Sequence, residues 1–307
     1  MMKRMVLVAS ALLIGAGSAI AAPLELPPNS PIFFQFNNIE QVNAANNLVV
    51  PGYAPAAAFG DGMQGNWGLF NISSVQAGAA SPFPLPTGHN DIAGGPTFFA
   101  DDGPGGAKGQ ISGIFYGLDF TSATTAVGGV IDIYWHESGN DTIDANCLVG
   151  VGCLPDAATV ARFTTGNSGV FLARLLFDFG IVPGNGVTTL KSTTDPTTQG
   201  GSGQADAFAN VDLSAGGLWK NVLNGNWFFV DGPDAGAVRG DGPNELRDLR
   251  FSTFFNADLD SWSAPGGTVG LRSNDPARVF TEAVPEPATL TLLGLGLAGL
   301  ARRRKKA

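Results

Sequence analysis

Short segments of alternating hydrophobic and polar residues recur along the chain between stretches rich in glycine and proline. The clearest is VIDIYW, in which Val130, Asp132 and Tyr134 alternate with three hydrophobic residues. A period of two with β-branched and aromatic residues is typical of a strand with two different faces. On these grounds we predict strands at Pro31–Phe36, Asn66–Val75, Ile111–Phe120, Gly129–His136, Ala158–Thr165, Gly203–Leu213, Asn226–Asp231 and Leu249–Phe255.

Three further segments complete the predicted fold. Val170–Gly180 is hydrophobic and fits both a strand and a helix, so both assignments stay open. Ala77–Gly109 and Pro183–Gly203 are rich in proline and glycine and are predicted to be loops. Many short strands between glycine and proline turns predict an all-β chain, and we expect a single β-sandwich or jelly-roll-like domain.

The N-terminus has the three parts of a secretory signal peptide. Lys3 and Arg4 precede an apolar run, and an A-x-A site ends at Ala21. We therefore predict a signal peptide at 1–21 and an exported domain at 22–283. The alternative is an uncleaved anchor, but the apolar run is short for a bilayer span.

The C-terminus carries a second targeting pattern. Pro285 and Pro287 flank Glu286, and both prolines favour extended backbone for the residues before them. The following 14-residue uncharged run, Ala288–Ala301, would cover roughly 21 Å as a helix, which is a marginal membrane span. A cationic cluster that resists translocation follows and marks the cytoplasmic side: Arg302, Arg303, Arg304, Lys305 and Lys306. A linker before a permanent anchor is the alternative interpretation.

These three parts, in this order at 284–307, resemble the PEP-CTERM sorting signal of Gram-negative bacteria. The resemblance implies recognition by exosortase, a transpeptidase-like membrane enzyme, and removal of the tail. It implies a chain that is exported, held transiently in the inner membrane by its C-terminal transmembrane helix, and then placed at the cell surface or in the extracellular matrix. It also implies a host that makes exopolysaccharide, biofilm or flocs.

The middle of the chain resembles the flocculation-associated group of PEP-CTERM proteins. The resemblance spans roughly 66–262 and is carried by strand-rich fragments such as NWGLFNIS, ISGIFYGLDF and GGSGQADAFANVDLSAGGLW. It implies a floc or matrix role and brings no known catalytic residues. The two cysteines and the predicted loop at 77–109 have no counterpart in that group.

Charge excludes one class of partner. Seven of the 17 Lys and Arg residues and one of the 26 acids lie in the two ends predicted to be removed. The remaining chain has 10 cations and 25 anions, a net charge of about −15. Because phosphate binding needs a basic surface, nucleic acid is not an expected partner.

Two residue sets suggest covalent or metal cross-links. Cys147 and Cys153 are close in sequence in an exported chain, so we predict a disulfide that stabilises by roughly 2 kcal/mol. A metal site is the alternative for this pair. No other cofactor is expected, but oxygen ligands at turns suit calcium, and the candidate ligands are Asp231, Asp234, Asp241 and Glu245.

Catalytic patterns are absent from the sequence. It contains no G-x-S-x-G, H-E-x-x-H or P-loop, and its two histidines are His89 and His136. Two carboxylates at a suitable separation would be enough for glycoside hydrolysis, and the sequence leaves that open.

We therefore expect a non-enzymatic, exosortase-processed protein associated with exopolysaccharide, biofilm or floc. A carbohydrate-binding jelly-roll module and, third, a secreted glycan-active enzyme are the alternatives. Exposed Trp and Tyr side chains in a groove would favour the carbohydrate-binding module. Two acids that face each other across a cleft would favour the enzyme.

Overall fold

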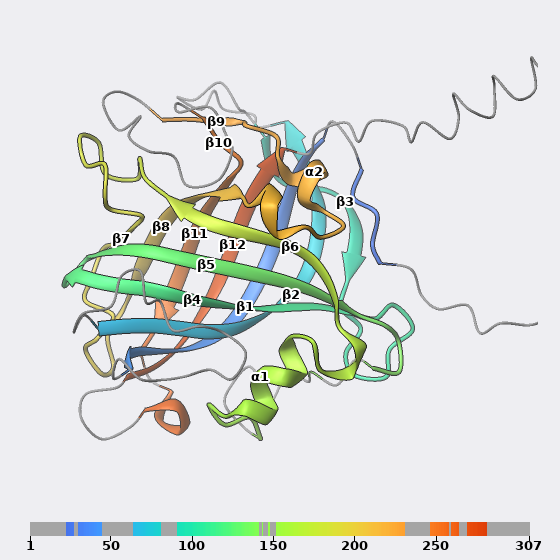
Figure 1. Cartoon of the computed structure of the whole chain (residues 1–307), viewed down its shortest axis with the longest axis horizontal. Coiled ribbons are helices and arrows are strands. Elements are labelled where there is room, and N and C mark those ends of the chain that lie inside the picture. The colour runs from blue at the N-terminus through green and yellow to red at the C-terminus, as the bar shows by residue number, and fades with distance from the viewer. Residues whose placement is uncertain are drawn as a thin grey trace, which may run out of the picture.

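The computed structural model describes residues 23–27, 30–44, 64–80, 91–140, 143, 147, 152–230, 246–257, 259–263 and 269–280. These residues form mainly antiparallel β-structure (Figure 1). The strands are β1 (Pro31–Ala44), β2 (Gln64–Ala80), β3 (Asp91–Ala100), β4 (Gln110–Ser122), β5 (Thr125–His136), β6 (Val170–Asp178), β7 (Leu190–Ser192), β8 (Ser202–Val211), β9 (Phe228–Phe229), β10 (Leu246–Arg247), β11 (Leu249–Asn256) and β12 (Val269–Phe280).

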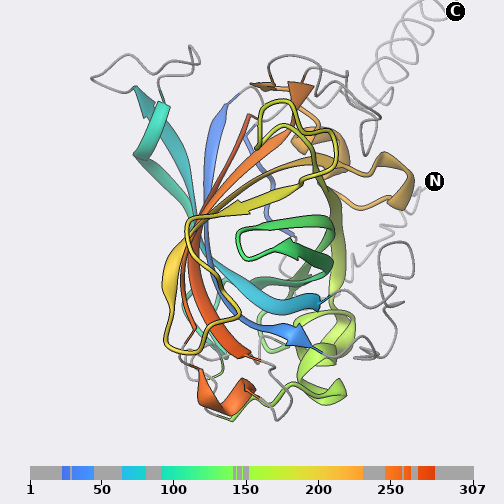
Figure 2. The ribbon, with the colours of Figure 1, turned by 90° about the vertical axis from the view of Figure 1, so that its left-hand side faces the viewer.

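The main sheet closes on itself as an eight-stranded antiparallel barrel, in the order β1-β12-β11-β8-β6-β5-β4-β2 (Figure 2). Closure comes from β1, which pairs with β2 along one edge and with β12 along the other. β3 pairs with the last part of β2, outside the closed circuit, and β7 pairs with β5 and β8. The prediction of an all-β chain is confirmed, whereas the prediction of a sandwich or jelly roll is wrong.

The missed strand β12 explains the error. Its sequence contains Gly270 and Pro276, which are turn residues in most contexts, and no strand was predicted there. In the barrel this segment pairs along 12 positions with β1, from Pro31↔Phe280 to Val42↔Val269. Period two shows which residues share a face of a strand, but it does not show which strands are neighbours.

Three local predictions also change. The segment Ala158–Thr165 was predicted as a strand, but most of it forms the helix α1 (Ala157–Phe163). Asp156 caps the start of this helix, because its side chain accepts a hydrogen bond from the amide of Thr159. The two predicted loops contain β3 and β7, because pairing with neighbouring strands outweighs their glycine and proline content. The ambiguous segment at 170–180 is the strand β6.

The barrel interior has two halves. At the start of β1 the inward residues, such as Ile32 and Phe34, are apolar. They pack in the same cluster as the helix α2 (Lys220–Leu223) and Trp219, which precedes it. There the ring of Trp219 stacks on Phe34 with centroids 5.9 Å apart, and its indole N–H donates to the carbonyl of Leu24 at 2.8 Å. Side chains of β1 and of the α2 segment thus pack against each other in this half of the interior.

A second cluster covers the outside of the wall formed by β1, β2 and β4. Phe163 of α1 and Trp262 pack there with Ile39 and Leu69, and all four side chains are fully buried. Cys147 and Cys153 are joined by a disulfide and belong to the same cluster. The indole N–H of Trp262 donates to the carbonyl of Cys153 at 2.9 Å, which ties the disulfide to this wall.

Candidate functional site: a cavity inside the barrel

The second half of the barrel interior contains a cavity of about 80 Å³. Small residues on β8 leave this space, because Ala205 and Ala207 present only a methyl group to the cavity. Gly68 on β2, in contrast, lies directly against the ring of Phe115. A Cβ atom at Gly68 would lie 2.5 Å from the ring of Phe115 and 2.6 Å from Cβ of Glu40. A volume of this size has room for several water molecules or a small organic group.

Four polar side chains form a cluster in the wall of this largely apolar cavity. Glu40 lies at its centre and is flanked by Asn38 on the same strand, Asn66 on β2 and Ser273 on β12. Asn66 Nδ2 donates to Glu40 Oε2 at 3.0 Å, and Asn38 Nδ2 donates to Oε1 at 3.2 Å. Because strand residues alternate between faces, the inward positions of β1 place Asn38 and Glu40 beside each other in the interior.

Burial and hydrogen bonding act in opposite directions on the carboxyl group of Glu40. The hydroxyl of Ser273 lies 2.6 Å from Asn38 Oδ1, which can only accept, so Ser273 donates there. Ser273 Oγ also lies 3.2 Å from Glu40 Oε1, the second acceptor to which its hydroxyl can donate. Burial raises the pKa of Glu40 to about 7, although three side-chain hydrogen bonds oppose the rise. Glu40 therefore changes charge near neutral pH.

This carboxyl group should make the barrel less stable as the pH rises. Its folded-state pKa of about 7 lies above the ordinary value of 4.5, so the folded state binds more protons than the unfolded state between these limits. Stability from the neutral acid is complete below pH 4.5 and is lost as the pH rises through 7. We expect Glu40→Gln to gain about 3 kcal/mol relative to wild type between pH 4.5 and pH 8.

Urea unfolding of both proteins at several pH values measures this difference. Glu137→Gln, at a partly exposed glutamate at the end of β5, controls for the loss of a carboxylate as such. A difference between wild type and Glu40→Gln that stays constant from pH 4.5 to 8 would contradict the assignment.

The cavity also contains two polar atoms without a hydrogen-bond partner among the described residues. They are Asn66 Oδ1 and Thr253 Oγ1, both buried, in residues that line the cavity. Leaving a buried polar group unsatisfied costs about 1–3 kcal/mol. These atoms therefore favour a cavity occupied by a ligand or by water that supplies the missing hydrogen bonds.

Outside the barrel, Ser112 and His136 form the contact that most resembles a nucleophile and its base. Ser112 Oγ lies 2.8 Å from His136 Nε2 and also 2.8 Å from the carbonyl oxygen of Phe163. Because the carbonyl only accepts, the hydroxyl donates to it, and His136 Nε2 must donate to Ser112. An imidazole that donates at Nε2 cannot take the serine proton, so this geometry joins β4, β5 and α1 without supplying a base.

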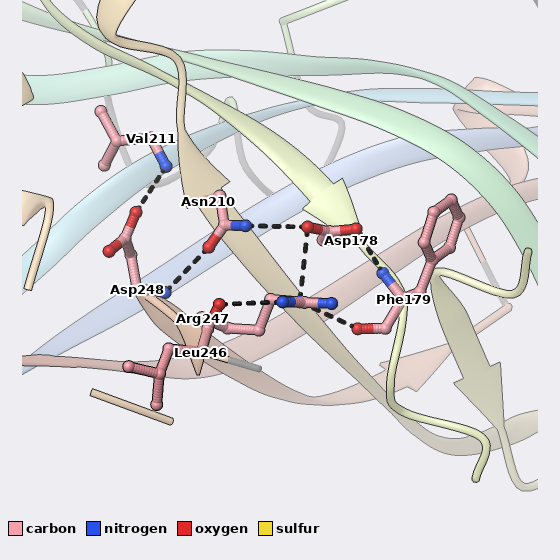
Figure 3. A network of polar contacts seen from close by, with 7 residues as sticks. All are labelled: Asp178, Phe179, Asn210, Val211, Leu246, Arg247 and Asp248. Atoms are coloured by element: carbon pink, nitrogen blue, oxygen red, sulfur yellow. Dashed lines mark hydrogen bonds and ion pairs between the residues drawn. The ribbon is translucent and has the colours of Figure 1, made fainter. Parts of the chain in front are cut away.

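A separate buried network joins β6, β8 and β10 (Figure 3). The guanidinium of Arg247 is fully buried, with Nε 3.3 Å from Asp178 Oδ2, and it donates to the carbonyls of Phe179 and Leu246. Asn210 Nδ2 donates to Asp178 Oδ2 at 2.8 Å. This network does not line the cavity, and its contacts within the chain identify it as a structural joint.

Most site residues expected from the sequence lie outside the described residues. This applies to the sorting triplet Pro285–Pro287, the basic cluster 302–306 and the candidate calcium ligands in 231–245. The signal peptide at 1–21 also lies outside them. The residues that the structure does describe include no group of three or more metal-ligating side chains and no helix long and apolar enough to cross a membrane.

The cavity residues were missed in the sequence. The predicted strand ended at Phe36, whereas β1 continues to Ala44. Continuing its period of two through FQFNNIEQV would have placed Asn38 and Glu40 on the same face as Phe34 and Phe36. Polar residues on an otherwise apolar face were the available signal.

Comparison with known proteins identifies the tail. A model of the PEP-CTERM protein-sorting motif matches residues 283–305. The chain therefore carries a PEP-CTERM sorting signal, which supports its assignment as an exosortase substrate. The signal implies export and transient anchoring in a membrane before processing. No curated protein matches the chain.

Proposed function

We propose that the mature chain is a non-enzymatic binding protein that holds a small molecule inside its barrel at the cell surface or in the exopolysaccharide matrix. The observation that carries this proposal is the cavity with a buried polar cluster in a largely apolar barrel interior. Apolar walls with a few placed polar groups are typical of small-molecule sites. Exosortase sorting supports the extracellular setting, and association with biofilm or floc is part of the proposal.

The two alternatives receive less support from the described residues. A sugar platform would need exposed aromatic rings that lie side by side. Four of the tryptophans are buried, and Trp227 is half-buried. The exposed rings of Phe98 and Phe254 lie on β3 and β11, which are not neighbouring strands. A glycan-active enzyme would need two acids across a cleft. Glu40 faces the cavity, whereas Asp206 lies between the inward Ala205 and Ala207 and so belongs to the outward-facing positions of β8.

Filling the cavity tests the proposal. Ala207→Leu adds three carbons at a wall position that is 2% exposed, and Phe254→Ala removes an outward ring that is 62% exposed. We expect n-butanol to shift NMR signals of cavity methyl groups in wild type and in Phe254→Ala, but not in Ala207→Leu. Equal shifts in all three folded proteins would place binding on the outer surface and contradict the proposal.

A further inference from the structure

We propose that the cavity selects a small organic amine, bound as its ammonium ion, with the nitrogen at Glu40 and Asn66 and the carbon body among phenylalanine rings. This inference rests on the proposed function, because it names the chemical class of the ligand that the barrel holds. It follows from three properties of the wall: its acceptor oxygens, its aromatic rings and the sign of its charges.

The polar part of the wall offers oxygen acceptors to a ligand. Asn66 Oδ1 has no partner among the described residues, although Asn66 is only 6% exposed, and Nδ2 of the same side chain is already committed to Glu40. Glu40 supplies a carboxylate that is 7% exposed. An ammonium group carries up to three donors and a positive charge, so it can satisfy Asn66 Oδ1 and pair with Glu40 at the same time.

The apolar part of the wall suits a cation with a hydrocarbon body. Seven phenylalanines line the cavity, among them Phe36, Phe70, Phe115 and Phe251. The face of an aromatic ring attracts a nearby cation, and this attraction strengthens when the site is dry. Rings around a carboxylate thus stabilise an amine in two ways, through its nitrogen and through its carbon atoms.

Charge excludes the opposite class of ligand. Among the described residues that line the cavity, Glu40 is the ionisable one whose side chain faces inward, and none is Lys, Arg or His. Asp206 is also at this wall, but it lies between the inward Ala205 and Ala207, so its side chain faces outward. An anion such as a carboxylate would therefore meet a buried acid and no counter-charge. The chain as a whole carries a net charge of −9, which also favours the approach of cations.

Three probes of the same length separate these classes. They are n-butylamine, n-butanol and n-butyrate, titrated into the mature domain with calorimetry and NMR as readouts. At pH 8 we expect butylamine to bind at least tenfold more tightly than butanol and butyrate not to bind. Glu40→Gln should remove the preference for the amine and leave butanol binding within about twofold, whereas Asp206→Asn should leave both unchanged.

The pH dependence provides a second readout. Butylamine stays protonated across the neutral range, while the ionised fraction of a Glu40 with a pKa of about 7 rises about tenfold between pH 6 and pH 8. Affinity for butylamine should rise by the same factor in wild type and in Asp206→Asn, and stay flat in Glu40→Gln. Affinity for butanol should not rise.

The outcomes separate the two proposals. If none of the three probes binds to the folded wild-type domain, the barrel is not a small-molecule site and both proposals fail. If butanol or butyrate binds as tightly as butylamine, or if Glu40→Gln keeps the amine preference, the barrel binds ligands but the inference about amines is wrong.

Discussion

Replacing Arg247 with alanine is expected to lower the free energy of unfolding by about 3–5 kcal/mol, the range for a buried ion pair that loses one partner. Arg247 and Asp178 are both fully buried, so the substitution leaves an uncompensated carboxylate between β6 and β8. It also removes the hydrogen bonds that Arg247 donates to the carbonyl oxygens of Phe179 and Leu246. Equilibrium unfolding in urea measures the loss.

The matched control is Arg250→Ala, on β11. Arg250 lies over the ring of Phe208, with its guanidinium carbon 5.9 Å from the ring centroid. A cation–π contact at a partly exposed site contributes about 0.5–1 kcal/mol, so this variant should lose little. Equal losses in the two variants would show that Arg247 acts as a general positive charge and not as the centre of the buried network.

Replacing Pro285, Glu286 and Pro287 with alanines is expected to trap nearly all of the protein in the inner membrane at full length. The triplet lies within the matched motif at 283–305 and is the part with restricted, extended backbone. The predicted signal peptide is untouched, so export itself should continue. Blots of inner-membrane, surface and medium fractions would show the shift.

The control replaces Thr281 and Glu282, just before the motif, with alanines, and should be processed like wild type. A strain without exosortase should reproduce the trapped form of the wild-type chain. If the triplet variant gave the same fragments in the same fractions as wild type, the triplet would not be part of the processing signal.

The sequence predicted the strands better than their arrangement. The predicted strands at 111–120, 129–136 and 203–213 match β4, β5 and β8 to within four residues at each end, because β-branched and aromatic residues between turn residues are a local signal. It did not reveal the barrel, because closure depends on pairing between β1 and β12, more than 200 residues apart. Gly270 and Pro276 hid β12, since turn propensity is a local property and strand pairing is not.

The cavity was less predictable than the tail. The sorting motif is contiguous, so its order of parts can be read directly. The polar cluster combines Glu40 with Asn66 and Ser273, which come from three strands and meet only after the barrel closes. The sequence could have shown that Glu40 and Phe36 lie on the same face of a strand. It could not have shown that alanines on β8 would lie opposite Glu40 and leave a cavity there.

Closure by β12 has a consequence for the timing of maturation. β12 ends at Phe280, and the sorting motif begins at residue 283. The connecting chain can extend by only about 10 Å, at 3.3–3.6 Å per residue. A finished barrel would therefore keep the start of the sorting motif within about 10 Å of the last paired residue of β12. We expect the folded domain to hinder the access of the processing enzyme to this short connection, so that pairing of β12 before cleavage slows release from the membrane.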